Sequence, residues 1–465
     1  MRKYRDKTNL IIMTIVAISI SLSMLILYLL YSYTITKIND TYYKYGAITH
    51  AISSICNNSD IHITLIHQDK KYDITLEDIN INTNIHTIID SKHQHMLDTS
   101  TYESTTNTIT KMKESDISYK DILNYIFIGF NTKINKIISD IEYEPIDSTI
   151  TFNKDSKSLF NITKSASGIK VDTTKLYTSI IENLMNSPNI TLEIPTITIN
   201  PIITEEYNKS LTHKISSFTT NVSDSTGGRK TNVKLALSKV NGLMVKPNES
   251  ISFNKITGPH TASTGYKPAT VILNGEYVED IGGGICQASS TLYNALLLTG
   301  TKITEVAKHS IPVKYVPLAL DAMVSEGIAD LKWTNTLNHP MFIHTYSDSD
   351  SVTVDIYSKP LEDNITYKTR SETLKTIDFD KDTIIKDTEQ KYTNHILYEG
   401  EYYRLKYPRV GYEAVGYLEK YKDNIKISET KIRHEIYKPQ NGVVVEGINT
   451  PVSGMTIENS IKIYN

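Results

Sequence analysis

The stretch over residues 279–300, EDIGGGICQASSTLYNALLLTG, constrains the fold more than any other part of the chain. Three consecutive glycines lead directly into Cys286, and glycine is used where φ must be positive or where the backbone must approach another group closely. Beyond Cys286 the apolar residues recur at helical spacing, at Leu292, Ala295, Leu296 and Leu298. The stretch therefore predicts a buried helix that carries Cys286 in its first turn and has Gly300 as its C-cap.

A cysteine in the first turn of a helix is a candidate nucleophile, because the unpaired N–H groups and the helix dipole there favour the thiolate. Such a nucleophile needs a base within hydrogen-bond reach and a third group that orients the base. His309 and Asp321 follow Cys286 in that order, so we predict these three residues as a catalytic set. An oxyanion or binding site is predicted from backbone N–H groups and side chains beside the cysteine, at Gly283, Gly284, Gln287, Ser289 and Ser290.

A purely structural role is the competing interpretation of the same residues. A free cysteine often serves as a small buried apolar side chain. His309 and Asp321 can satisfy one another, and the glycines can serve tight turns alone. The sequence leaves both interpretations open.

The N-terminal segment reads as a membrane anchor. Residues 10–31 contain no charged side chain and as a helix would span roughly 33 Å, enough to cross a bilayer. Basic residues precede the segment, which predicts a cytoplasmic tail over residues 1–9. A cleaved signal peptide is the alternative, but the small-x-small cleavage pattern is missing. We therefore expect a single-pass protein of the cell membrane, with a stalk over residues 32–59 and its bulk outside the cell.

Composition excludes several classes of function. The net charge of −3 argues against nucleic acid as a partner. Cys56 and Cys286 are the only two cysteines, too few for a disulfide-stapled domain, although a single bridge between them remains an alternative. No histidine or cysteine pair has a recognised metal-ligand spacing, and the glycine run lacks the lysine of a phosphate-binding loop. We predict no metal and no cofactor.

Residues 60–141 are predicted to form a membrane-proximal α+β region. Residues 61–80 alternate apolar and polar side chains around a turn at residues 68–71, which is typical of a β-hairpin. Residues 118–138 have apolar residues at helical spacing.

A second α+β domain is predicted over residues 142–207. It combines short strands, a helix over residues 173–185 with Asp172 as N-cap, and a closing strand over residues 190–203. The GIKVD turn, the helix after it and the closing PIITEEY resemble the peptidoglycan-binding domain found ahead of several wall-associated bacterial domains.

Residues 214–357 carry a dense series of motifs: SFTT, GRKTNV, SFNKITGP, GGGICQASSTLYNA, HSIPVKYVP, DAMV and WTNTLNHP. In this order they resemble the VanW family, named for an accessory protein of vancomycin-resistance clusters. The family usually has a second histidine before the His-Ser pair and Gly-Arg before the Asp-Ala pair. This chain has Ala307-Lys308 and Ala319-Leu320 at those places. The resemblance implies an α+β domain of the cell envelope and names no reaction.

Residues 368–465 are rich in strand-forming residues with regular turns. They resemble the β-modules named for their five glycines, which typically bind sugars or act as spacers. We therefore predict a β-rich C-terminal module.

Together these features predict an α+β multidomain protein in the envelope of a Gram-positive bacterium. Its expected partners are peptidoglycan or wall peptides, with the membrane contacted through one helix. A wall-binding or scaffolding role is the first hypothesis. The alternative is a cysteine-dependent peptidase or transpeptidase that uses Cys286, His309 and Asp321. The sequence leaves the oligomeric state open.

Overall fold

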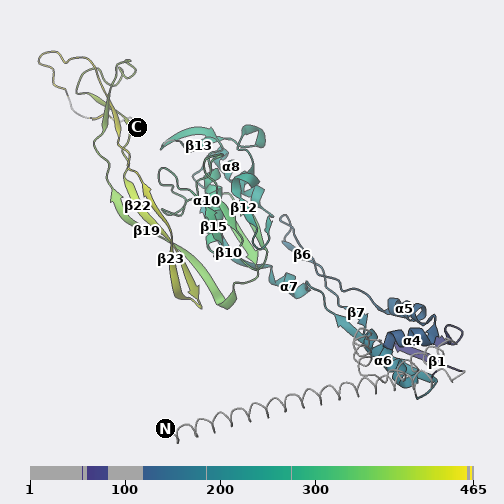
Figure 1. Ribbon diagram of the computed structural model, residues 1–465. Coiled ribbons are helices and arrows are strands. Elements are labelled where there is room, and N and C mark those ends of the chain that lie inside the picture. Colours follow the sequence, from purple (N-terminus) through teal and green to yellow (C-terminus); the bar gives the residue numbers. More distant parts are fainter. Residues whose placement is uncertain are drawn as a thin grey trace, which may run out of the picture. The chain divides into compact units, whose positions relative to one another are not determined.

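The computed structural model describes residues 55, 60–81, 119–184, 186–273, 275–457 and 461–462. The chain divides into two compact units, Met1–Asp147 with Ser165–Ile202, and Ser148–Lys164 with Ile203–Asn465 (Figure 1). The predicted tail, membrane anchor, most of the stalk and Cys56 lie outside the described residues. Among the helices that the structure describes, none has both the length and the apolar content needed to cross a bilayer.

The first unit contains a three-stranded sheet in the order β2-β1-β8. Strands β1 (His62–His67) and β2 (Lys70–Thr75) are antiparallel, and β8 (Asn189–Glu193) runs parallel to β1. The turn between β1 and β2 places Gln68 at φ 54. The predicted β-hairpin is therefore confirmed.

Three helices supply most of the apolar core of this unit: α4 (Tyr119–Ile126), α5 (Phe130–Ile141) and α6 (Thr173–Leu184). The helical spacing over residues 118–138 does not give one helix, because β4 (Phe127–Ile128) and Gly129, at φ 90, separate α4 from α5. Asp172 Oδ1 accepts a hydrogen bond from the backbone N–H of Lys175 at 3.1 Å, which confirms it as the N-cap of α6.

The remaining strands of the first unit are β3 (Asn80–Ile81), β7 (Gly168–Val171) and β9 (Thr196–Ile199). The closing strand predicted over residues 190–203 is in fact two strands, β8 and β9. They are interrupted at Pro195, which has no N–H to donate and restricts the residue before it. Strand β9 pairs with β7 instead of continuing the sheet of β8.

The second unit is built on a four-stranded sheet in the order β10-β18-β17-β11. Its strands are β10 (His213–Asn221), β11 (Met244–Val245), β17 (Met341–Ser347) and β18 (Ser351–Ser358). Helices α8 (Gly227–Val240) and α10 (Ile285–Leu297) pack against this sheet and each other, and together they form a second apolar core (Figure 1).

Smaller elements surround that core. A second sheet has the order β12-β16-β15, and two hairpins pair β13 with β14 and β5 with β6. These elements, with three short helices, are β5 (Ile150–Phe152), β6 (Phe160–Ile162), α7 (Glu205–Ser210), β12 (Ser250–Ser252), α9 (Phe253–Thr257), η1 (Ala262–Thr264), β13 (Pro268–Leu273), β14 (Glu276–Ile281), β15 (Lys302–Glu305) and β16 (Lys332–Thr334).

The β5–β6 hairpin belongs to the second unit although its residues interrupt the first in sequence. The reason is aromatic packing, since the Phe152 and Phe160 rings lie 6.1 and 5.2 Å from that of Phe342 in β17.

The C-terminal part of the second unit consists of two sheets, in the orders β19-β22-β23 and β20-β24-β21-β25. The predicted β-rich C-terminal module is thereby confirmed as β-rich, and the described chain as a whole is multidomain and rich in strands, with few helices. The elements are η2 (Glu362–Asn364), β19 (Ile365–Ile377), β20 (Thr383–Lys386), β21 (Tyr402–Lys406), β22 (Gly411–Lys422), β23 (Ile425–Tyr437), β24 (Val443–Glu446) and β25 (Ile461–Lys462).

Candidate active site around Cys286

The glycine run shapes the entry into α10. Gly282 and Gly284 adopt φ values of 90° and 111°, and Gly284 is the N-cap of the helix. A Cβ on Gly283 would lie 2.5 Å from the carbonyl oxygen of Ala269 in β13. Only glycine meets all three demands without strain or a clash. The run therefore delivers Cys286 to the first turn of α10, as predicted.

Helix α10 is buried almost completely. Of its 13 residues, every one except Cys286 is buried. Cys286 itself is partly exposed, and its Sγ lies 3.4 Å from the carbonyl oxygen of Val324, to which it donates. Cys286 is thus the only residue of this helix that is not fully buried.

His309 and Asp321 form a buried pair beside the cysteine. Nδ1 of His309 lies 2.7 Å from Asp321 Oδ2, and that oxygen also accepts the backbone N–H of His309 at 2.7 Å. The two residues are 4% and 1% exposed. His309 also lies close enough to Cys286 for each group to shift the pKa of the other. The structure thus brings the three predicted catalytic residues together.

The electrostatics of the three groups favour charge separation between the thiol and the imidazole. Burial raises the pKa of Cys286, but its hydrogen bond to His309 and the charge on that ring outweigh burial and lower the pKa. Burial lowers the pKa of His309, but hydrogen bonds to Asp321 and Cys286 outweigh it and raise the pKa to about 9. Burial likewise raises the pKa of Asp321, and the hydrogen bond from His309 overcomes it and lowers that pKa. These directions favour a thiolate beside an imidazolium more than in the free side chains.

The second oxygen of Asp321 is held by the C-terminal module. Tyr437, the last residue of β23, donates its hydroxyl to Asp321 Oδ1 at 2.7 Å and accepts the N–H of Ala319 at 3.0 Å. Arg433 of β23 donates to the backbone carbonyl of Asp321 and lies 3.8 Å from Oδ1. Ala319 has φ 61, a conformation that favours glycine, the residue usual in the VanW family at this place.

Sequence reasoning missed Tyr437 and Arg433, because 116 and 112 residues separate them from Asp321. It also gave no role to Arg229, although this residue stands in the GRKTNV motif. Arg229 Nη2 donates to Gln287 Oε1 at 3.0 Å, and its charge helps to lower the pKa of Cys286. Tyr315 Oη lies 3.5 Å from His309 Nε2.

The side chains predicted for an oxyanion or binding site are engaged within the fold. Gln287 Nε2 donates to the backbone carbonyl of Asn221 at 2.7 Å, and the Ser289 hydroxyl donates to the backbone carbonyl of Ala322. Ser290 Oγ accepts the N–H of Ala322 at 2.9 Å. These bonds tie α10 to β10 and to the segment that carries Asp321. The N–H of Cys286 differs, since it has no acceptor within the described part of the chain.

Comparison with known proteins assigns two regions. Residues 228–357 match the family described as "VanW like protein", and residues 72–191 match "Putative peptidoglycan binding domain". The chain carries a VanW-like domain. Cys286, His309 and Asp321 all lie within it, whereas Arg433 and Tyr437 lie beyond it. The peptidoglycan-binding match begins before the predicted 142–207 domain and overlaps it.

Two curated relatives align with this chain. "Uncharacterized protein YoaR" of Bacillus subtilis is 36% identical over 168 residues, which is 36% of this chain and 55% of the relative. "Vancomycin B-type resistance protein VanW" of Enterococcus faecalis is 30% identical over 132 residues, 27% of this chain and 48% of the relative. The chain thus spans about half the length of the curated relatives it matches. Together with the peptidoglycan-binding-like domain, these similarities make it a cell-wall-associated, VanW-like protein.

Two solved structures were also found. "IgA1 Protease G5 domain structure" is 17% identical and covers 19% of this chain and 98% of its own, with a TM-score of 0.14. "Crystal structure of HP0197-G5" is 19% identical and covers 18% of this chain and 97% of its own, with a TM-score of 0.12. Scores this low support no conclusion about fold or function.

Within the described residues, no group of three or more histidine, cysteine, aspartate or glutamate side chains is placed to hold a metal ion. The arrangement around Cys286 brings together a thiol, an imidazole and a carboxylate.

Proposed function

We propose that the VanW-like domain is a cysteine-dependent acyl-transfer site that acts on peptide amide bonds of peptidoglycan, as a peptidase or a transpeptidase. One observation carries the proposal: Asp321 holds His309 through Nδ1, and His309 lies close enough to Cys286 for each group to shift the pKa of the other. A histidine that serves only to neutralise a buried carboxylate does not need a thiol beside it.

The chemistry follows from the positions of the three groups. The Cys286 thiolate attacks the amide carbonyl, and the developing oxyanion is stabilised by the unpaired N–H of Cys286 at the start of α10. The His309 imidazolium gives its proton to the leaving amine, and a thioester to Cys286 remains. Water or a second amine then attacks the thioester while His309 takes a proton from it. Water completes hydrolysis, and an amine completes transpeptidation.

We also propose that residues 10–31 anchor the chain in the cell membrane and that its bulk lies outside the cell, as the preceding basic residues predict. A protease added to intact cells is then expected to degrade the chain beyond residue 60. Survival of the chain until the cells are lysed would refute this placement.

A non-catalytic wall-binding role is the second candidate. It is favoured by a separate observation, the commitment of the Gln287, Ser289 and Ser290 side chains to internal hydrogen bonds. In that role the polar cluster serves only to fix the fold of the domain, and the peptidoglycan-binding-like domain provides the contact with the wall.

The two candidates are separated by the reactivity of Cys286 toward iodoacetamide, measured from pH 5.5 to 9 in a Cys56→Ser background. The enzyme requires fast alkylation well below the ordinary thiol pKa of about 8.5. Incubation with wall peptides and mass spectrometry then detects cleaved or joined products, with Cys286→Ala as the control. Slow alkylation at all pH values before denaturation would leave only the wall-binding role.

A further inference from the structure

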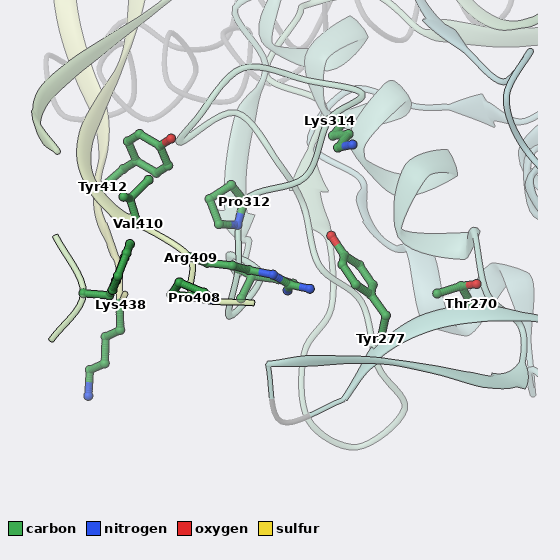
Figure 2. Close-up of a pocket in the computed structure, with 11 residues that line it drawn as sticks. Thr270, Tyr277, Pro312, Lys314, Pro408, Arg409, Val410, Tyr412 and Lys438 are labelled. Atoms are coloured by element: carbon green, nitrogen blue, oxygen red, sulfur yellow. The ribbon is translucent and has the colours of Figure 1, made fainter. Parts of the chain in front are cut away.

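A pocket with a volume of about 920 Å³ lies in the second unit beside the Cys286 site, and neither the mechanism nor the comparisons assign it a role. The VanW-like domain contributes residues from β13, β14 and the 311–314 segment. The C-terminal module contributes Phe379, residues 408–410, Tyr412 in β22 and Lys438 after β23. The residues that matter most to the argument are Tyr277, Lys314, Arg409, Tyr412 and Lys438 (Figure 2).

The pocket adjoins the Cys286 site along two segments of chain. Lys314 lies one residue before Tyr315, whose hydroxyl is 3.5 Å from His309 Nε2. Thr270, another lining residue, is held against the glycine run, because a Cβ on Gly283 would lie 2.6 Å from its carbonyl oxygen. The pocket wall is therefore continuous with the segment that reaches His309 and with the backbone that packs on the glycine run before α10.

Hydrogen bonds and an ion pair join the VanW-like domain to the C-terminal module around the pocket. Gln440 of the C-terminal module donates to the carbonyl of Gly275 at 3.0 Å, and Lys406 forms an ion pair with Glu276 at the start of β14. On the other side Tyr437 bonds to Asp321. The two walls are thus fastened together at separate points, which is the preformed geometry typical of a ligand site.

The charge of the lining has one sign. Lys314, Arg409 and Lys438 line the pocket, and none of its lining residues is acidic. Within the described residues, none of these three cations forms an ion pair. Arg409 lies 4.7 Å from the centroid of the Tyr277 ring and extends toward it, whereas Lys438 points away from both (Figure 2). A guanidinium stacked on an aromatic ring keeps its N–H fork free for a carboxylate.

We infer that this pocket binds the carboxylate-bearing part of a wall peptide and places the neighbouring amide bond at Cys286. The inference rests on the proposed function and names its substrate class. Arg409 and Lys314 hold carboxylates, while the Tyr277 and Tyr412 rings cover the apolar portions of the peptide.

Binding is tested with the full chain carrying Cys286→Ala, so that no turnover is needed. The probes are a stem peptide with free carboxylates and the same peptide with every carboxylate amidated. We expect the acid to bind at least about 10-fold more tightly than the amide. Arg409→Gln and Lys314→Gln should each weaken binding of the acid by about 10-fold, because each loses one charge-assisted hydrogen bond. The matched control Lys375→Gln, an exposed lysine of β19, should leave it unchanged.

Equal binding of acid and amide, or unaltered binding by both Arg409→Gln and Lys314→Gln, would overturn the assignment. Binding of a wall phosphodiester polymer in place of the peptide would overturn it as well. Lys314→Gln keeps the test decisive if loss of the Arg409–Tyr277 stacking disturbs the fold. If the acid binds as expected but the wild-type chain neither cleaves nor joins wall peptides, the proposed reaction fails and the pocket stands. If the wild-type chain turns over acid and amide equally well, the reaction stands and the pocket assignment fails.

Discussion

Helices α6 and α10 are similar in length, with 12 and 13 residues, yet they are buried in different ways. Helix α6 buries one face that is wholly apolar apart from a tyrosine hydroxyl, made of Leu176, Tyr177, Ile180, Ile181 and Leu184. Helix α10 buries all its residues except Cys286, including serine, threonine, asparagine and glutamine. The first pattern is that of a helix that only stabilises a core.

The polar residues of α10 determine where the segment with Asp321 lies. Asn294 Nδ2 donates to the carbonyl of Leu320 at 2.9 Å, and Ser290 Oγ accepts the N–H of Ala322 at 2.9 Å. These bonds hold the residues on both sides of Asp321 against α10. Because α10 also carries Cys286, they fix the position of Asp321 relative to the cysteine. Buried side-chain hydrogen bonds contribute little net stability, so the polar residues of α10 replace apolar packing with contacts that hold the Asp321 segment in place. Mutations should therefore affect reactivity in α10 and stability in α6.

The largest effect is expected from His309→Ala. Without the imidazole the Cys286 pKa returns toward that of an ordinary thiol, since the hydrogen bond and charge that lower it are gone. At pH 6.5 a thiol of pKa about 8.5 is roughly 1% thiolate, so alkylation by iodoacetamide should slow by up to about 100-fold. His213→Ala, an exposed histidine at the start of β10, is the control. Equal rates in wild type and His309→Ala would show that the two side chains do not act as a pair.

Ile180→Ala in α6 is expected to lower stability and to leave the reactivity of Cys286 unchanged. Ile180 is fully buried in the apolar core of the first unit, so its truncation should lower the free energy of unfolding by about 3 kcal/mol. Guanidinium unfolding measures the loss, and Glu182→Ala on the exposed face serves as its control. Alkylation of Cys286 should keep its wild-type rate. A change in that rate would mean that the contrast between the two helices does not hold.

A pH-dependent effect on stability is expected from His309. Its pKa is raised to about 9 in the folded chain, so its contribution is complete below the unfolded pKa of about 6.5 and is lost as pH rises through the folded value. The pKa of Cys286 is lowered in the folded chain, so its effect on stability changes with pH in the opposite direction to that of His309. The comparison is therefore made between Cys286→Ala and Cys286→Ala/His309→Gln, which both lack the thiol. The difference in melting temperature should be largest near pH 6 and fall as pH rises, reaching its high-pH value below about pH 9, because Cys286, one of the groups that raise the pKa of His309, is absent from both variants. A constant difference over this range would argue against a raised pKa for His309.

Features that depend on a few neighbouring residues were predictable from the sequence. The glycine run, the helix after Cys286, the β1–β2 hairpin and the Asp172 cap all follow from local backbone preferences. Two predictions were wrong although the sequence carried a local signal against each. Gly129 separates α4 from α5 where one helix was predicted, and Pro195 separates β8 from β9 where one strand was predicted.

Features that depend on distant contacts were not predictable. The sequence places Cys286, His309 and Asp321 in order, but only the fold shows that Tyr437 and Arg433 of β23 reach Asp321. The aromatic packing that draws the β5–β6 hairpin into the second unit is likewise a long-range effect. No hydrophobic period or turn signal specifies which strand of one module meets which loop of another.

The smallest effect is expected from Tyr437→Phe, which tests whether the C-terminal module contributes to the site. The substitution removes the hydroxyl that bonds to Asp321 Oδ1 and keeps the buried ring. A carboxylate that loses one of its bonds is less restrained and orients His309 less firmly, so the alkylation rate of Cys286 at pH 6.5 should fall by about 5-fold, the equivalent of about 1 kcal/mol. Tyr421→Phe removes a comparable bond to Glu419 in the same module and should leave the rate unchanged. The alkylation profile distinguishes the two roles of Tyr437: a hydroxyl that only stabilises the fold would lower the melting temperature without shifting the pH profile, whereas one that positions Asp321 would shift the profile to higher pH.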